Sequence, residues 1–264
     1  MRILVIHGSM RKGNTYALTK EITSRLSAKL DVKISEISVA DIDLPFCTSC
    51  HVCFSKGEEF CPNQKNIQGI RDGLLDCDGV IITGTTYVWA LNAAMKNVLD
   101  HFAYMFHRPA LFGKHGLILV TSAGNNEKAI AKYIKTVIGQ MGINKAMIFT
   151  QNTKQKLMAS DAALNQKYDK IADAFYIRVK LKRQVSPSLK SIAKHNAFRA
   201  MLQSEFSDYP RDTEYWKEPS NGGSAYPVKI NFFTRFIGAM VYSIVKAAIK
   251  AVGKSYTKKL KSQE

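Results

Sequence analysis

Short apolar runs alternate with helical patterns through the first 150 residues of this 264-residue chain, and this alternation restricts the fold more than any other feature. The apolar runs predict five strands, over residues 2–6, 32–39, 79–84, 116–121 and 146–150. The segments between them predict helices, over residues 15–30, 67–75, 92–106 and 127–141. Strands that alternate with helices favour a parallel sheet, because each right-handed crossover must be covered by a helix. The sequence therefore predicts a doubly wound α/β sheet.

Ligands of such sheets bind beyond the carboxyl ends of the strands, near the point where the strand order reverses. That rule selects three loops, over residues 8–14, 85–89 and 122–126. The first loop joins a buried strand to a helix, where unpaired N–H groups and the helix dipole favour an anion. Its alternative reading is a helix that Asn14 or Thr15 merely caps. It matches neither the P-loop nor the dinucleotide-binding glycine pattern.

The three loops together are similar to those of the NAD(P)H-dependent FMN reductase and iron-sulfur flavoprotein family. Residues 8–15 read Gly-Ser-Met-Arg-Lys-Gly-Asn-Thr. They resemble the family's phosphate loop, in which Gly-Ser-Pro-Arg leads to Gly-Asn-Thr. The family's Ser-Pro-Val-Tyr loop corresponds to residues 85–89, although the tyrosine comes one place earlier and the proline is missing. Residues 94–100 resemble the helix that follows, and residues 121–124, Thr-Ser-Ala-Gly, end the fourth strand.

The resemblance covers residues 1–150 and implies a flavodoxin-like five-stranded sheet of order 2-1-3-4-5. It implies an FMN-binding domain over 1–150, followed by a basic helical C-terminal extension over 151–264. The residues implied to bind FMN are Ser9, Arg11, Gly13, Asn14, Thr15, Thr85, Thr86, Tyr87, Val88, Trp89, Ser122, Ala123 and Gly124. The implied activity is an FMN-dependent oxidoreductase that takes electrons from NAD(P)H or a protein donor. Its acceptor would be a small molecule or a ferredoxin-like protein, and the protein would form a homo-oligomer such as a dimer.

Four of the five cysteines lie close together, at Cys47, Cys50, Cys53 and Cys61. In a reducing compartment such crowding favours metal or cluster ligation over disulfides. Cysteines three residues apart let a winding loop present successive thiolates to one compact cluster. The run resembles the motif of iron-sulfur flavoproteins and so implies a [4Fe-4S] cluster near the flavin, although Ser49 stands where the family often has glycine.

Two other interpretations of the cysteine run stay open. One is a structural zinc site, built from the four cysteines or from three of them with His51. The other is a loop of thiols that binds no metal. Cys77 lies next to the third predicted strand and is expected to be a small buried residue. We assign no role to His101 or His107.

Basic residues concentrate in the second half of the chain. The formal net charge is +17, and residues 151–264 hold 21 Lys and Arg against 9 Asp and Glu, which is +12. This half predicts helices over 159–183, 189–206 and 230–260, with a turn-rich stretch over 208–226 between the last two. A basic surface can attract a phosphorylated ligand, an anionic membrane or nucleic acid, or it can simply be solvated. Nucleic acid is the partner that we do not expect.

The last predicted helix carries a wide apolar stripe with lysines between and beyond its members. Such a helix packs on its own domain or on a second subunit. The alternative is peripheral contact with a membrane surface through residues 230–261. Neither a signal peptide nor an uninterrupted run of about 18 apolar residues is visible, so the expected location is the cytoplasm.

Overall fold

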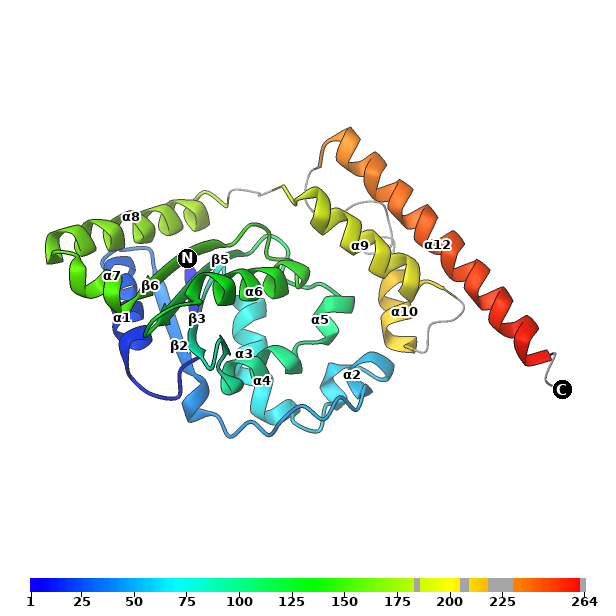
Figure 1. Ribbon diagram of the computed structural model, residues 1–264, viewed down its shortest axis with the longest axis horizontal. Coiled ribbons are helices and arrows are strands. Elements are labelled where there is room, and N and C mark those ends of the chain that lie inside the picture. Colours follow the sequence, from blue (N-terminus) through cyan, green and yellow to red (C-terminus); the bar gives the residue numbers. More distant parts are fainter. Residues whose placement is uncertain (183–185, 205–208, 218–229, 262–264) are drawn as a thin grey trace.

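The computed structural model describes residues 1–182, 186–204, 209–217 and 230–261, the last with side chains up to residue 253. Figure 1 shows a central sheet with helices on both faces and a group of helices, α9, α10 and α12, at one side of it. The expected α/β fold with a helical C-terminal region is confirmed.

Five parallel strands form the sheet. They are β1 (Arg2–His7), β2 (Lys33–Ser38), β3 (Gly79–Tyr87), β5 (His115–Ser122) and β6 (Met147–Asn152). Their order is β2-β1-β3-β5-β6, which is the expected 2-1-3-4-5 when the parallel strands alone are counted. The chain adds one strand that the sequence did not predict, β4 (Ala90–Leu91), which pairs antiparallel with the end of β3. The hydrophobic residues of β1, β3 and β5 are buried because helices cover both faces of the sheet.

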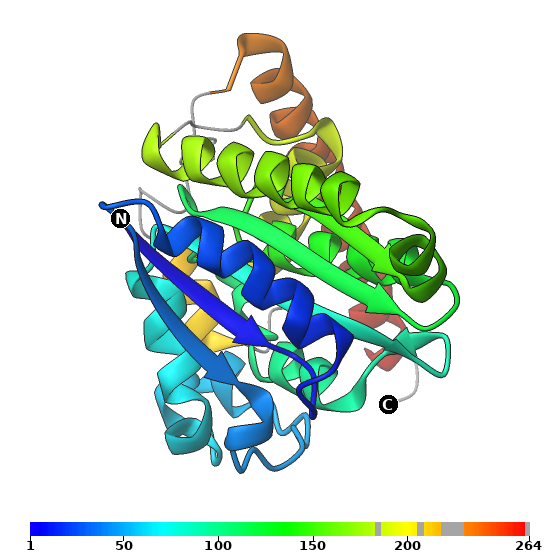
Figure 2. The same ribbon diagram turned by 90° about the vertical axis from the view of Figure 1, so that its left-hand side faces the viewer.

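One face of the sheet is covered by α3 (Gln64–Asp76), α4 (Ala93–His101) and α6 (Glu127–Gln140). The other face is covered by α1 (Asn14–Ser27) and α8 (Asp161–Lys180), which lie side by side in Figure 2. Two ion pairs reach α8 from this segment, Arg25 of α1 with Asp169 and Lys29, just after α1, with Asp173. The helices therefore form a layer on each side of the strands, as a doubly wound fold requires.

Helix α8 belongs to the packing of the sheet, although it lies beyond residue 150. Its buried residues Phe175 and Val179 join the same core as Ile3 and Val5 of β1. A Cβ atom added to Gly79 would lie 2.9 Å from Val179, so α8 approaches the start of β3 very closely. Residue 150 itself lies inside β6. We therefore propose that the flavodoxin-like unit ends after Lys180, in place of the expected boundary at 150.

Several helices differ from the predicted ones. The segment 92–106 forms two helices, α4 and α5 (Tyr104–His107), and the helix expected over 159–183 is preceded by a separate α7 (Thr153–Met158). The segment between β2 and α3, which holds the cysteine-rich loop, contains α2 (Val52–Ser55) and two 3₁₀ turns, Val39–Asp41 and Glu58–Phe60. The prediction of turns over 208–226 is wrong for α10 (Pro210–Lys217), because proline is well accommodated in the first turn of a helix. Residues 208 and 218–226 of that stretch lie outside the described residues.

The C-terminal helices pack on one another, and α9 also contacts α6. Helix α9 (Leu189–Leu202) lies against α12 (Phe232–Lys261). A Cβ atom on Gly238 of α12 would lie 2.7 Å from the Asn196 side chain of α9, so only glycine permits this approach. Helix α10 contacts both α9 and α2, and it thereby joins the C-terminal region to the cysteine-rich loop.

Candidate functional site

The loop after β1 provides donors for an anion at the start of α1. The helix begins after Gly13, and no side chain caps it, so the interpretation of Asn14 or Thr15 as a cap is not supported. The unpaired N–H groups of the first turn therefore stay available to a ligand. Arg11 and Asn14 are exposed beside them, and Ser9 is half-buried. The Ser9 hydroxyl donates to the Arg11 carbonyl at 2.9 Å and so shapes the loop.

Gly8 holds this loop against the neighbouring strand. Its N–H group donates to Thr83 Oγ1 at 3.0 Å, and its carbonyl accepts from Asn92 Nδ2 at 2.6 Å. A Cβ atom at this position would lie 2.2 Å from the Thr83 carbonyl oxygen. Thr15, in contrast, is buried and forms a 2.6 Å hydrogen bond with Thr121 Oγ1. Thr15 therefore joins the first loop to the end of β5, and its hydroxyl already has a partner.

The loop after β3 is a tight hairpin with an aromatic tip. Tyr87 pairs with Ala90, and the two residues between them, Val88 and Trp89, have φ of 47° and 60°. Positive φ at both central positions is the geometry of a type I′ turn, which usually contains Asn or Gly. A β-branched residue in this region is strained, and such strain is found most often at functional sites. Tyr87 is 70% exposed and Trp89 is 71% exposed.

The third loop follows β5 and lies beside this hairpin. Asn126 donates from Nδ2 to the Trp89 carbonyl at 2.6 Å, which joins the two loops directly. Ala123 and Gly124 are exposed, whereas Ser122 is buried and donates to Glu127 Oε2 at 2.7 Å. The structure therefore brings all three predicted loops to one edge of the sheet.

Glu127 is a site residue that the sequence reasoning missed. It is buried at the start of α6, and Asn152 donates to its other carboxylate oxygen at 3.3 Å. Burial opposes ionisation, but hydrogen bonds from Ser122, its own backbone amide and Asn152 lower the pKa of Glu127 below its ordinary value. A buried carboxylate is thus fixed next to the predicted loop. Its position at the first turn of the helix that follows this loop was the only sequence signal.

Three buried polar atoms at this edge have no hydrogen-bond partner among the described residues, His7 Nδ1, Thr86 Oγ1 and Asn92 Oδ1. Buried polar groups are nearly always hydrogen-bonded, so such atoms point to a missing ligand or water. Next to the first loop is a cavity of about 310 Å³, lined by His7, Arg11 and Glu36 among others. This cavity lies on the β2 side of the first loop, and no residue of the other two loops lines it. The uncapped helix start and the exposed aromatic hairpin are the features that fit a phosphorylated aromatic cofactor such as FMN.

The four clustered cysteines share one cavity of about 350 Å³. They are Cys47, Cys50, Cys53 and Cys61. His101 of α4 also lines this cavity. Cys77 is buried in the core of the α3 face, as expected, and is separate from this cavity.

The backbone winds sharply between the cysteines. Ser49 and His51, the residues directly before and after Cys50, have φ of 52° and 60°. These left-handed positions favour glycine, which explains why glycine suits the position of Ser49 in the family motif. Asn97 of α4 fixes the start of the loop, because it accepts from the Cys47 N–H at 3.0 Å and donates to the carbonyls of Leu44 and Pro45. The loop is therefore held so that successive thiols face one space.

The thiols in this structure are not arranged as a metal site. Among the residues that the structure describes, no group of three or more His, Cys, Asp or Glu side chains could hold a metal ion. Burial raises the pKa of the Cys53 thiol to about 12, although the nearby charge of Arg108 acts in the opposite direction. The thiol donors and their shared cavity suit a metal or cluster, but in their present arrangement the described side chains do not form such a site.

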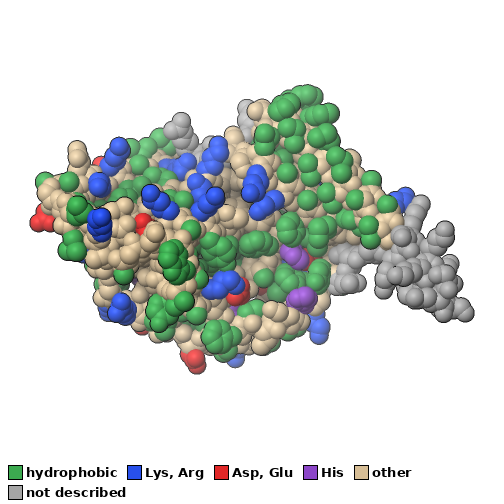
Figure 3. All heavy atoms as spheres, in the orientation of Figure 1, with side chains coloured by type: hydrophobic (Ala, Val, Ile, Leu, Met, Phe, Trp, Pro, Cys, Tyr) green, Lys and Arg blue, Asp and Glu red, His purple; other side chains and the backbone are tan. Residues whose placement is uncertain are grey.

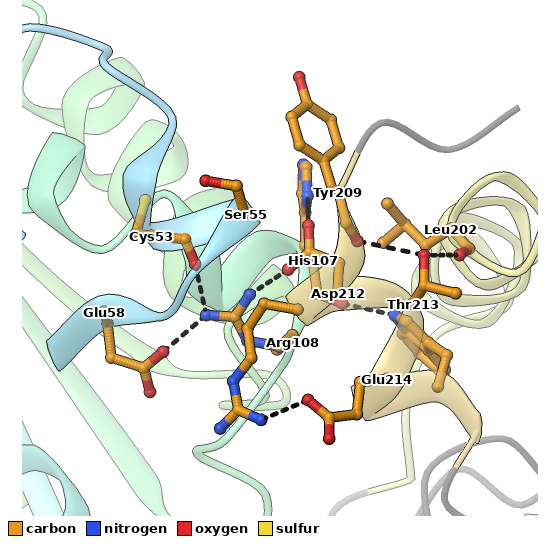
Figure 4. A network of polar contacts seen from close by, with 12 residues as sticks. Cys53, Ser55, Glu58, His107, Arg108, Leu202, Tyr209, Asp212, Thr213 and Glu214 are labelled. Atoms are coloured by element: carbon orange, nitrogen blue, oxygen red, sulfur yellow. Dashed lines mark hydrogen bonds and ion pairs between the residues drawn. The ribbon is translucent and has the colours of Figure 1, made fainter. Parts of the chain in front are cut away.

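A buried ionic network links the cysteine loop to α10 (Figure 4). The Arg108 guanidinium donates to the Cys53 carbonyl at 2.9 Å and to Glu58 Oε2 at 2.6 Å. Its other side donates to the carboxylate of Asp212, which is fully buried in α10. The second oxygen of Asp212 lies 2.5 Å from His107 Nδ1.

Aromatic contacts strengthen the same junction. The His107 ring stacks on Phe54 of α2 with centroids 4.4 Å apart, and Trp216 Nε1 donates to the His107 carbonyl at 2.9 Å. The Tyr209 hydroxyl lies 3.2 Å from His51 Nδ1 and forms a hydrogen bond with it. Neither His101 nor His107 received a role from the sequence, yet one lines the cysteine cavity and the other supports its loop. Their partners lie far apart in the chain, so spacing alone could not reveal them.

Comparisons with known proteins agree with this geometry. Residues 1–164 match the family model described as NADPH-dependent FMN reductase. An iron-sulfur flavoprotein of Archaeoglobus fulgidus is 25% identical over 223 residues, which cover 83% of this chain and 98% of the relative. An iron-sulfur flavoprotein of Clostridioides difficile is 27% identical over 239 residues, with the same coverage of 83% and 98%.

Solved structures show the same fold. The apo form of the NADH:FMN oxidoreductase EMOB superposes with a TM-score of 0.52 at 22% identity, over 67% of this chain and 88% of that chain. FerB, an NAD(P)H:(acceptor) oxidoreductase from Paracoccus denitrificans, gives a TM-score of 0.51 at 15% identity, over 69% and 98%. Because the family model matches more than half of the sequence, this chain belongs to the NADPH-dependent FMN reductase family.

Proposed function

We propose that the protein is an FMN-dependent oxidoreductase that takes electrons from NAD(P)H or a protein donor and passes them to a small-molecule or protein acceptor. The observation that carries this proposal is the meeting of three loops at the carboxyl edge of the sheet. One loop has an uncapped helix start, one an exposed aromatic hairpin, and the third is bonded to that hairpin by Asn126. Family membership and the FMN reductase description support it.

Each loop would have its own task. The N–H groups after Gly13, with Ser9, Arg11 and Asn14, would hold the phosphate. The aromatic faces of Tyr87 and Trp89 would cover the ring system, as their exposure permits. Bound FMN would supply hydride and electron transfer, while the protein supplies binding and orientation. The buried carboxylate of Glu127 would fix the third loop through Ser122.

We further propose that Cys47, Cys50, Cys53 and Cys61 hold a [4Fe-4S] cluster. Support comes from the shared cavity and from the iron-sulfur flavoproteins to which the chain is similar. A cluster would carry single electrons to or from the flavin. The thiols would have to rearrange to ligate a cluster, and they lie on a loop of short helices and turns. Zinc and free thiols are the competing proposals.

The cysteine cavity also favours a second candidate function, an electron-transfer or redox-sensing protein without a small-molecule substrate. In that case NAD(P)H would be a poor donor, and exchange with a ferredoxin-like protein would be fast. Steady-state oxidation of NADH and of NADPH, compared with the rate of exchange with reduced ferredoxin, separates the two functions. The dimeric state and the cytoplasmic location stay predictions.

The decisive experiment is anaerobic purification of the full chain, followed by FMN titration, absorption spectra, and iron, zinc and sulfide analysis. The proposal expects one FMN per chain and iron with sulfide. Cys50→Ser should remove the iron, whereas Cys77→Ala, outside the cavity, should keep it. Absence of a flavin spectrum after FMN is added would overturn the main proposal. Flavin without iron would overturn the cluster alone, and zinc in its place would support the structural site.

A further inference from the structure

Helix α12 is attached to the protein along one side only. Gly238 lies against Asn196 and Ile192 of α9, and the Tyr242 hydroxyl donates to Gln203 Oε1 at 3.0 Å. The Tyr242 ring also lies 4.3 Å below the guanidinium of Arg199. These contacts define the packed side of the helix. They leave the opposite side without a partner among the described residues.

That outward side is apolar over the first half of the helix. Its exposed members, with their exposed fractions, are Phe232 84%, Phe233 64%, Phe236 58%, Met240 46% and Ile244 60%. Only 11% of the segment Phe232–Gly253 is buried, and its mean hydropathy is 1.5. In the described part of the chain, this is the one helix long and apolar enough to cross a bilayer. Apolar patches of this kind mark interaction surfaces.

A cleft between α6 and α9 collects lysines beside this helix. Its volume is about 550 Å³, and its basic lining residues are Lys132, Lys135, Lys145, Lys190 and Lys194. No acidic side chain lines it, and none of these lysines forms an ion pair within the described residues. Figure 3 shows Lys and Arg side chains gathered next to the apolar surface of α12 on the same face of the molecule.

We propose that the outward side of α12 and this lysine cleft form one docking surface for an anionic lipid bilayer. A bilayer supplies both an apolar phase and negative headgroups, which is the combination that amphipathic membrane-surface helices use. A second copy of this chain suits the surface poorly. Residues 232–261 contain no Asp or Glu, so two copies would bring basic surfaces together without compensation. Nucleic acid would match the lysines but leave the exposed phenylalanines in water.

The helix would lie along the bilayer surface. To span the membrane, α12 would have to leave α9 and expose the close contact at Gly238. In the surface arrangement that contact persists, and only side chains that already face solvent enter the lipid. The lysines would lie at headgroup level, where each basic residue contributes about 1 kcal/mol, or about fivefold in partitioning.

The test is vesicle flotation with the full chain, using phosphatidylcholine vesicles with and without phosphatidylglycerol. We expect binding to the anionic vesicles that weakens with salt. Replacing Lys135, Lys190 and Lys194 together by Gln should weaken it on the order of a hundredfold. The matched control replaces Lys33, Lys167 and Lys170, which removes the same charge elsewhere and should weaken it much less.

The apolar side is tested with Phe236→Ser/Met240→Ser/Ile244→Ser, which should reduce binding by at least about a hundredfold. Its control is Leu157→Ser/Met158→Ser, which alters side chains that are 79% and 76% exposed on α7. A second measurement uses Met240→Trp, whose fluorescence brominated lipids should quench in anionic vesicles. This readout does not depend on the triple variant folding correctly.

Four results would overturn the proposal. The first is equal binding to both kinds of vesicle, unchanged by either triple variant. The second is loss of a dimer in the apolar variant without any vesicle binding, which would assign the surface to a second copy. The third is DNA binding in place of vesicle binding, and the fourth is resistance to alkaline carbonate extraction, which would show that α12 spans the bilayer.

Discussion

Replacement of Asp212 by Asn tests whether α10 holds the cysteine loop through a buried charge network. The Asp212 carboxylate is fully buried, and its two oxygens face Arg108 and His107. The substitution keeps the shape of the side chain but leaves a buried guanidinium with one acidic partner, Glu58. Breaking one side of a buried ion pair costs about 3–5 kcal/mol. Because Glu58 remains, we expect the lower end of that range, about 3 kcal/mol.

The measurement is urea denaturation of the full chain, followed by circular dichroism and by Trp fluorescence. A loss of about 3 kcal/mol corresponds to a decrease of about 6–12 °C in melting temperature for a protein of this size class. Hydrogen exchange should show faster exchange in α2 and α10 than in the central strands. Glu214→Gln, which removes an exposed i,i+3 pair with Arg211, is the control and should cost less than about 0.5 kcal/mol.

A double variant separates the charge from the packing. Arg108→Met/Asp212→Leu removes both buried charges, and it should be more stable than Asp212→Asn alone. A loss below about 1 kcal/mol for Asp212→Asn, or unchanged exchange in α2, would show that the network does not hold the loop.

Three further variants test other parts of the structure. Gly8→Ala should abolish tight FMN binding in a titration, because its Cβ atom would lie 2.2 Å from the Thr83 carbonyl oxygen. Trp89→Ala should weaken FMN binding by about three- to tenfold without changing the melting temperature, since the side chain is exposed. Burial and the charge of Arg199 lower the pKa of His195 to about 4. The unfolded chain binds that proton near pH 6.5, so this contribution to stability is complete above that pH and is lost between about pH 6.5 and 4, by at most about 1.4 kcal/mol per unit. His195→Gln should make the loss between about pH 6.5 and 5 smaller in urea denaturation.

The alternation of apolar runs predicted the parallel sheet and the three loops at its carboxyl edge, because strand and crossover rules act locally along the chain. The strand order was implied by the resemblance to the family. Helix bounds were less well predicted. The end of the predicted helix over 92–106 is a separate short helix, and α10 forms where the sequence predicts turns. Pro210 is compatible both with a turn and with the first turn of a helix. The burial of Trp216 and Asp212 against residues distant in the chain favours the helix.

By itself, the sequence determined the fold class and the chemistry of the donors. Gly, Ser and Asn follow a buried strand at 8–15, and four thiols lie within one short segment, 47–61. Only the tertiary structure decided which groups meet. It joined Thr15 to Thr121, placed Glu127 behind Ser122, and brought Asp212 to the loop of Cys53 through Arg108. It also left one side of α12 exposed. The physical reason is that such contacts join residues far apart in the chain, where no spacing rule applies and only packing of the whole chain selects the partner.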